Sequence, residues 1–156
     1  MLSVYVPRGT TLERVQIDPG TPLPDEAVWI DLVTPTVQED KLVEQLLGIA
    51  VPTREEMQEI EVSSRLYVEN GARYMTATLM CQSDTATPKT TAVTFIVSSH
   101  KLATVRYDDP RPFAIVEHKL ARACPAKVTG ESVLMDLLDA VIDRSADILE
   151  RVGAEV

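Results

Sequence analysis

Residues 28–36 read VWIDLVTPT, and this stretch decides how the rest of the chain is arranged. The mostly apolar, β-prone run at 27–33 predicts an inner strand that is covered on both faces of its sheet. Thr36 and Glu39 match a capping box, in which a threonine hydroxyl and a glutamate carboxylate bind free backbone amides at a helix start. We therefore expect a strand, a short loop and a helix that ends near Gly48.

A second capping box follows almost at once. Thr53 and Glu56 repeat the pattern after a proline, and they open a short helix. From residue 62 the hydrophobic period changes to two, which is typical of a strand, so this helix cannot run far. The segment is very acidic, with Glu55, Glu56, Glu59 and Glu61.

The pair Asn70-Gly71 predicts a β-hairpin, because both residues tolerate the positive φ of a type I′ turn. A two-residue turn there pairs Val68 with Arg73, Tyr67 with Tyr74, and Leu66 with Met75. We expect the face toward the core to hold Leu66, Val68, Met75, Ala77 and Leu79. The opposite face then holds Arg65, Tyr67, Glu69, Tyr74 and Thr76.

The remaining elements follow from the same signals. Short strands are predicted at 2–6, 12–17, 90–97 and 102–107, with proline-rich or polar loops at 18–24 and 84–88. A helix at 113–123 follows a proline, and its expected inward side chains are Ile115, Val116, Leu120 and Ala121.

The segment 131–152 is the clearest helix. Its apolar side chains fall on one side at helical spacing: Leu134, Leu137, Leu138, Val141, Ile148, Leu149 and Val152. Its acids fall opposite them: Asp136, Asp139, Asp143, Asp147 and Glu150. This acidic face fits either a solvated surface or an interface with a basic or cation-bridged neighbour. Acids persist to the C-terminal end, where the helix dipole disfavours them, so we expect the natural chain to continue.

Composition bounds the function. The 156 residues fit one domain, with the sheet in roughly 1–107 and further helices in 111–152. With 24 acidic and 15 basic residues the net charge is −9, which disfavours nucleic acids and anionic membranes and suits cations or basic partners. The two cysteines form no CxxC pair, no signal peptide is present, and no apolar run reaches the ~20 residues of a membrane span. We expect a soluble α/β domain from a reducing compartment.

No catalytic motif stands out. His100 and His118 have no His, Cys or carboxylate at metal-ligand spacing, and no serine lies in a nucleophile elbow, so we expect no enzyme. The acidic cluster at 55–61 is the remaining candidate, because Mg²⁺ is often held through its waters by one or two carboxylates. The alternative is that Glu56 only caps its helix.

Several segments in a fixed order suggest a family. They are a strand at 29–32 (WIDL), a helix that ends in a Gly-Ile pair, a short Glu-Glu helix, a tyrosine-rich hairpin, and strands at 94–97 (TFIV) and 102–106 (LATVR). Residues 134–143 (LMDLLDAVID) then match a Leu-x-Asp-Ala-hydrophobic-hydrophobic-Asp helix. Together these segments resemble the cytoplasmic N-terminal domain of the CorA family of divalent metal ion transporters, over nearly the whole chain.

The resemblance implies an αβα sandwich with a mixed parallel and antiparallel sheet, hung below a homopentameric pore in the inner membrane. In that family a long stalk helix leads into two transmembrane helices. A Gly-Met-Asn motif selects hydrated Mg²⁺, and some branches handle Co²⁺, Ni²⁺ or Zn²⁺. The 156 residues contain neither that motif nor a membrane span. We therefore expect the terminal helix to stop before the stalk, and the chain alone, as a monomer or dimer, not to conduct ions.

The resemblance also implies a regulatory Mg²⁺ site. The family places an acid early in the short helix, where it holds Mg²⁺ against an acid on the neighbouring subunit's stalk. Alignment puts Glu56 at that position, with Glu55 before it. The surroundings differ, since the family often has His-Pro-Leu before the pair and Arg-Pro-Lys after it, whereas this chain has 50–52 (AVP) and 63–65 (SSR).

Two functions from different classes follow. The first is a cytoplasmic ion-sensing domain whose partners are copies of itself and weakly bound divalent cations. The second is a free-standing acidic α/β domain that binds a partner or a small ligand, which an apolar pocket with converging polar groups would favour.

Overall fold

The computed structural model describes residues 1–156 except 19, 60–64, 82–88 and 156. Glu61 of the acidic cluster, the predicted loop at 84–88 and one residue of the loop at 18–24 therefore lie outside the described residues. The strands are β1 (Leu2–Arg8), β2 (Thr11–Gln16), β3 (Trp29–Val33), β4 (Leu66–Glu69), β5 (Ala72–Cys81), β6 (Lys89–Ser98) and β7 (Lys101–Arg106). The helices are α1 (Val37–Leu47), α2 (Arg54–Glu59), α3 (Arg111–Arg122) and α4 (Gly130–Glu155).

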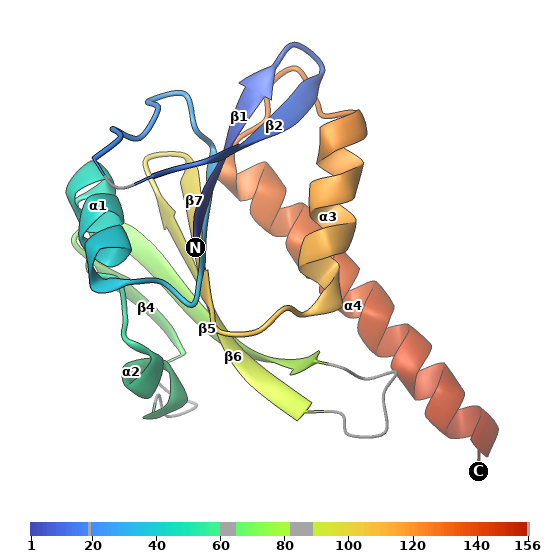
Figure 1. Cartoon of the computed structure of the whole chain (residues 1–156). Helices are drawn as coiled ribbons and strands as arrows, with labels where there is room; N and C mark the ends of the chain where they lie inside the picture. Colours follow the sequence, from blue (N-terminus) through green and yellow to red (C-terminus); the bar gives the residue numbers. More distant parts are fainter. Residues whose placement is uncertain (19, 60–64, 82–88, 156) are drawn as a thin grey trace.

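The seven strands form one sheet in the order β2-β1-β3-β7-β6-β5-β4. Only the β3–β7 pair is parallel among the described ladders, and the others are antiparallel. Helices α1 and α2 lie on one side of the sheet and α3 and α4 on the other (Figure 1). The predicted αβα sandwich with a mixed sheet is confirmed.

Both faces of the sheet are covered by apolar cores, which is why β3 is buried almost throughout. On the α1/α2 side the core includes Ile30, Leu32 and Val43. On the α3/α4 side it is built on aromatic rings: Trp29 stacks on Tyr5 with centroids 4.2 Å apart, and Phe113 packs against Trp29 at 6.3 Å. The prediction of an inner strand covered on both faces is confirmed.

The two capping boxes form as predicted. In α1 the Glu39 amide donates to the Thr36 hydroxyl at 3.1 Å, and the Thr36 amide donates to the Glu39 carboxylate at 2.9 Å. The helix ends at Gly48, which has a φ of 64°. In α2 the amide of Glu56 donates to the Thr53 hydroxyl at 3.2 Å, and the Thr53 amide donates to the Glu56 carboxylate at 3.1 Å.

The β4–β5 hairpin has the predicted register, with Tyr67 opposite Tyr74. The predicted core face is wrong at its edge, because Leu66 is 71% exposed and Val68 is 70% exposed. On the opposite face Tyr74 is buried, in the core beneath α1 and α2. The reason is that α1 and α2 cover one side of this hairpin, whereas the α3/α4 core reaches only as far as β5 on the other side.

Helices α3 and α4 bury narrower stripes than predicted. In α3 the buried residues are Pro112, Phe113, Val116 and Leu120. Ile115 is 46% exposed and Ala121 is also exposed, so both were wrongly placed inward. In α4 the inner turns bury Leu137, whereas Leu149 and Val152 are exposed because the helix runs past the sheet (Figure 1). No helix in the described part of the chain is both long and apolar enough to cross a bilayer.

Candidate functional site

Helix α2 carries the predicted metal residues outward from the sheet. Met57 is 2% exposed and anchors the helix in the core, whereas Glu55 and Glu56 are exposed. Glu56 is also close enough to Tyr67 to help raise the pKa of that phenol, after burial and Glu69. The capping role of Glu56 and its exposure therefore coexist. One carboxylate oxygen accepts the Thr53 amide while the side chain stays at the surface.

The described residues contain no group of three or more His, Cys, Asp or Glu side chains placed to hold a metal ion. Glu55 and Glu56 are adjacent on the same short helix, so they are brought together by sequence rather than by folding. Glu59 lies at the end of α2 and is exposed as well.

A tyrosine clamp fixes the connection between α1 and α2. The Tyr74 hydroxyl donates to the Ala50 carbonyl at 2.7 Å and accepts from the Ala50 amide at 3.1 Å. The Tyr67 ring stacks on Tyr74 with centroids 4.6 Å apart, and burial raises the pKa of Tyr74. The clamp ties the segment before α2 to β5, and so it sets where the acids of α2 lie.

The four predicted interface acids of α4 line one groove of about 350 Å³ between α3 and α4: Asp136, Asp139, Asp143 and Asp147. Basic side chains line it too: Arg111, Lys119 and Arg144. Lys119 pairs with Asp136 at 3.3 Å. Part of the acidic face is thus matched by a basic neighbour within the same chain.

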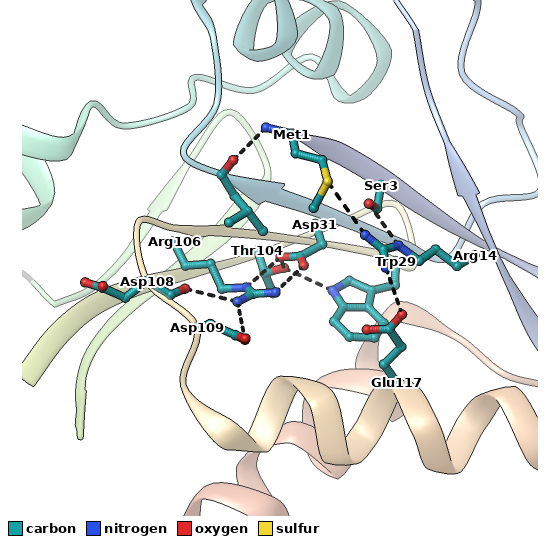
Figure 2. A network of polar contacts seen from close by, with 11 residues as sticks. Met1, Ser3, Arg14, Trp29, Asp31, Thr104, Arg106, Asp108, Asp109 and Glu117 are labelled. Carbon is teal, nitrogen blue, oxygen red and sulfur yellow. Dashed lines mark hydrogen bonds and ion pairs between the residues drawn. The ribbon is translucent and has the colours of Figure 1, made fainter. Parts of the chain in front are cut away.

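A buried ion pair was missed by the sequence analysis. Arg106 at the end of β7 donates to both carboxylate oxygens of Asp31 in β3, at 2.8 and 3.2 Å (Figure 2). Thr104 donates to the same carboxylate at 2.8 Å and accepts from the Trp29 indole at 3.0 Å. The only sequence signal was a lone acid inside a buried apolar strand, which needs a partner.

The ion pair is largely buried, although both of its residues line a pocket of about 240 Å³. The side chains of Asp31 and Arg106 are 4% and 9% exposed, and the guanidinium lies 4.3 Å from the centre of the Phe113 ring. Burial alone would lower the pKa of Arg106, but the contacts with Asp31 and Asp109 outweigh it and raise that pKa. The network joins β3, β7 and the start of α3, and it is structural in character.

A cavity of about 470 Å³ beside α1 has apolar walls, including Leu2, Ile17 and Leu42. Its rim includes Thr36 and Glu39, whose polar groups already bind each other in the capping box. The charge of Glu39 is therefore used within the chain, whereas Asp18, which also lines this cavity, has no such contact with the capping box among the described residues.

A family model described as "CorA-like Mg2+ transporter protein" matches residues 24–156. The chain belongs to this family.

The relatives agree with this assignment. The magnesium transport protein CorA of Escherichia coli K12 is 25% identical over 156 residues, which is 100% of this chain and 49% of that protein. The CorA of Wolinella succinogenes is 26% identical over 132 residues, covering 82% of this chain and 41% of that protein. The chain thus spans about half the length of the curated relatives it matches.

Solved structures show the same fold. The soluble domain of CorA from Methanocaldococcus jannaschii superposes with a TM-score of 0.69 at 15% identity, covering 99% of this chain and 61% of that one. The full-length CmaX protein superposes with a TM-score of 0.71 at 14% identity, covering 98% of this chain and 49% of that one.

Proposed function

We propose that this chain is the cytoplasmic ion-sensing domain of a CorA-like divalent cation transporter of the inner membrane. In this proposal Glu56, assisted by Glu55, supplies carboxylate oxygens to a regulatory Mg²⁺ ion that is shared with a neighbouring subunit of a homopentamer. The proposal rests on the family membership and on one feature of the structure: both carboxylates are exposed on a helix whose other face is buried.

The coordination chemistry supports a shared site. Mg²⁺ takes about six oxygen ligands and releases its waters reluctantly, so two carboxylates on one helix hold it weakly. An acid from another subunit would complete the inner or water-mediated shell. The isolated chain is therefore expected to bind Mg²⁺ weakly, and Co²⁺, Ni²⁺ or Zn²⁺ would compete for the same oxygens according to the branch of the family.

In this proposal, electrostatic repulsion between subunits drives the change between the closed and the open assembly. The chain carries −9, so copies that face each other through acidic surfaces repel across an interface of low dielectric constant. Bound Mg²⁺ removes this repulsion and favours the closed assembly, and its loss favours the open one.

The test uses the full-length protein that contains this chain, with Mg²⁺-dependent protection from limited proteolysis as the readout. Glu56→Gln is the informative variant, because glutamine keeps the capping box while it removes the charge. The Mg²⁺ concentration for half-protection is expected to rise by about tenfold or more, the loss that follows even from changing an outer partner of a metal ligand.

Glu59→Gln is the matched control, since it removes an equal charge from the same exposed helix. A shift of equal size in the control would show that only bulk charge matters. Calorimetry on the 156-residue chain gives a separate check. Tight stoichiometric Mg²⁺ binding by isolated monomers would contradict a shared site.

A further inference from the structure

A second cavity lies beside α2, where Arg54, Met57 and Gln58 line it. It is lined by residues of α2, β5 and β6, by Arg65 just before β4, and by Tyr107 and Asp108 just after β7, and its volume is about 300 Å³. Ligand pockets in proteins begin at about this size. Its lining includes two arginines, Arg54 and Arg65, and three threonines: Thr78, Thr90 and Thr91.

Two arginines give the cavity its charge. Arg65 donates to the Thr78 hydroxyl at 3.1 Å and to the Thr76 carbonyl at 3.4 Å, so its guanidinium is held at the wall by neutral acceptors. The Arg54 guanidinium lies 5.2 Å from the centre of the Tyr107 ring. Within the described residues neither arginine forms an ion pair with a carboxylate.

The one acid among the described lining residues already has a basic partner. Asp108 pairs with Lys89 at 2.7 Å, and the hydrogen bond from Lys89 holds the pKa of that carboxyl below its usual range. Lys89 offsets the charge of Asp108, and Glu55 acts electrostatically on Tyr107 in the lining without forming an ion pair with Arg54 or Arg65 among the described residues. Among the described lining residues two guanidinium groups outnumber one carboxylate, so this cavity is positive in a chain of net charge −9.

We propose that this cavity binds the phosphate group of a small metabolite. Guanidinium groups bind phosphate through two parallel hydrogen bonds, and hydroxyl groups donate to the remaining oxygens. Arg54 and Arg65 supply the charge, and Thr90 supplies a hydroxyl, whereas the Thr91 hydroxyl is already hydrogen-bonded to Asp108. The described lining of this site contains none of the glutamates proposed to hold Mg²⁺.

Isothermal titration calorimetry on the 156-residue chain tests the site with three probes: inorganic phosphate, AMP and adenosine. AMP is expected to bind one to one and adenosine is not. If AMP binds more tightly than inorganic phosphate, the organic part also contacts the cavity and a phosphorylated metabolite is the ligand. If the two bind alike, the site is a free-phosphate site of the same chemistry.

Two variants on separate elements locate the binding. Arg54→Gln and Arg65→Gln are each expected to weaken binding by about tenfold or more, because hydrogen bonds between charged groups are the strong ones. Arg73→Gln is the matched control. It removes an equal charge from β5, but Arg73 alternates with Tyr74 and so lies on the other face of the sheet. Its binding constant is expected to stay within about twofold.

Several outcomes would overturn the proposal. They are no binding of phosphate or AMP at about 10 mM, equal binding of adenosine and AMP, or equal weakening by all three arginine variants. If a variant fails to fold by circular dichroism, amide NMR shifts of the wild-type chain decide. AMP is expected to move the signals of Thr78, Thr91 and Tyr107, and shifts confined to the α3–α4 groove would refute the site.

Discussion

The ion pair between Asp31 and Arg106 provides the sharpest test of how this fold is held together. Replacing Asp31 with alanine removes the partner of a guanidinium whose side chain is only 9% exposed, together with two hydrogen bonds of 2.8 and 3.2 Å. Breaking one side of a buried pair typically costs about 3–5 kcal/mol, because a charge is left buried without compensation. That is a large part of the ~5–15 kcal/mol by which domains are stable.

Two contacts that Arg106 keeps in the Asp31→Ala variant determine where in that range its loss of stability falls. Arg106 keeps the Asp109 carboxylate at 3.0 Å and the Asp108 carbonyl at 3.0 Å. Asp109 is 77% exposed, so its charge is screened by water and compensates little. The loss also strands the Thr104 hydroxyl, which donates to Asp31 at 2.8 Å. We therefore expect Asp31→Ala to cost about 3 kcal/mol or more.

A double replacement separates charge burial from packing. Arg106→Met keeps an unbranched apolar stem near the Phe113 ring and removes the charge. The combined Asp31→Ala and Arg106→Met variant is expected to be less destabilised than the sum of the single variants by about 2 kcal/mol, since no buried charge remains unpaired.

Urea unfolding followed by circular dichroism at neutral pH measures all four proteins of the cycle. A cost below about 1 kcal/mol for Asp31→Ala would refute the argument, because that is the value of a solvated surface pair. Strict additivity in the cycle would refute it as well, since it would mean that the two groups do not interact.

Three further predictions concern local features. Burial, helped by Glu44 and Glu39, raises the pKa of Asp40 to about 6. The folded protein therefore binds this proton more tightly than the unfolded chain does, and the free energy of unfolding falls as the pH rises from about 4 to about 6. Asp40→Asn should therefore be more stable than wild type at pH 7.5, by on the order of 1 kcal/mol in urea unfolding, with the difference vanishing below pH 4; an equal difference at both pH values would contradict this. Tyr74→Phe should lower stability by about 1–2 kcal/mol because it strips the hydroxyl that binds the α1–α2 connection, whereas Tyr67→Phe should change it little. A Cβ at Gly130 would overlap the backbone at the start of β7, so Gly130→Ala should cost about 1–3 kcal/mol, while Gly153→Ala, with open space around it, should be neutral or slightly stabilising in thermal melts.

Capping and turn contacts could be predicted from the sequence, because they join residues that are close together along the chain. The capping boxes join residues three apart, and Asn70-Gly71 sets the hairpin register through the geometry of its own turn. The exposed acids of α2 follow from its capping box as well, because an acidic N3 residue lies at the helix surface.

Which face of each strand is buried was harder to predict from the sequence, because it depends on which helix packs over which strand. The alternation of β4 and β5 was assigned correctly, yet it could not say which side of the hairpin is covered. Tyr74 is buried because the segment after α1 docks on it, and Leu66 is exposed because the α3/α4 core stops short of β4. Alternation fixes that two faces differ, and tertiary packing decides which one is buried.

The Asp31–Arg106 pair shows the same limit at longer range. Its partners are 75 positions apart, and they meet only because β3 and β7 pair in parallel with Asp31 opposite Thr104. Side chains on adjacent parallel strands that lie two residues apart in register share a face, so Arg106 reaches back along the strand to the carboxylate. A lone acid in a buried strand indicates that it has a polar or charged partner elsewhere in the fold. Identifying that partner requires the strand order. The parallel pairing of β3 with β7 makes the sheet mixed, and it also places Arg106 against the carboxylate of Asp31 at the centre of the sheet.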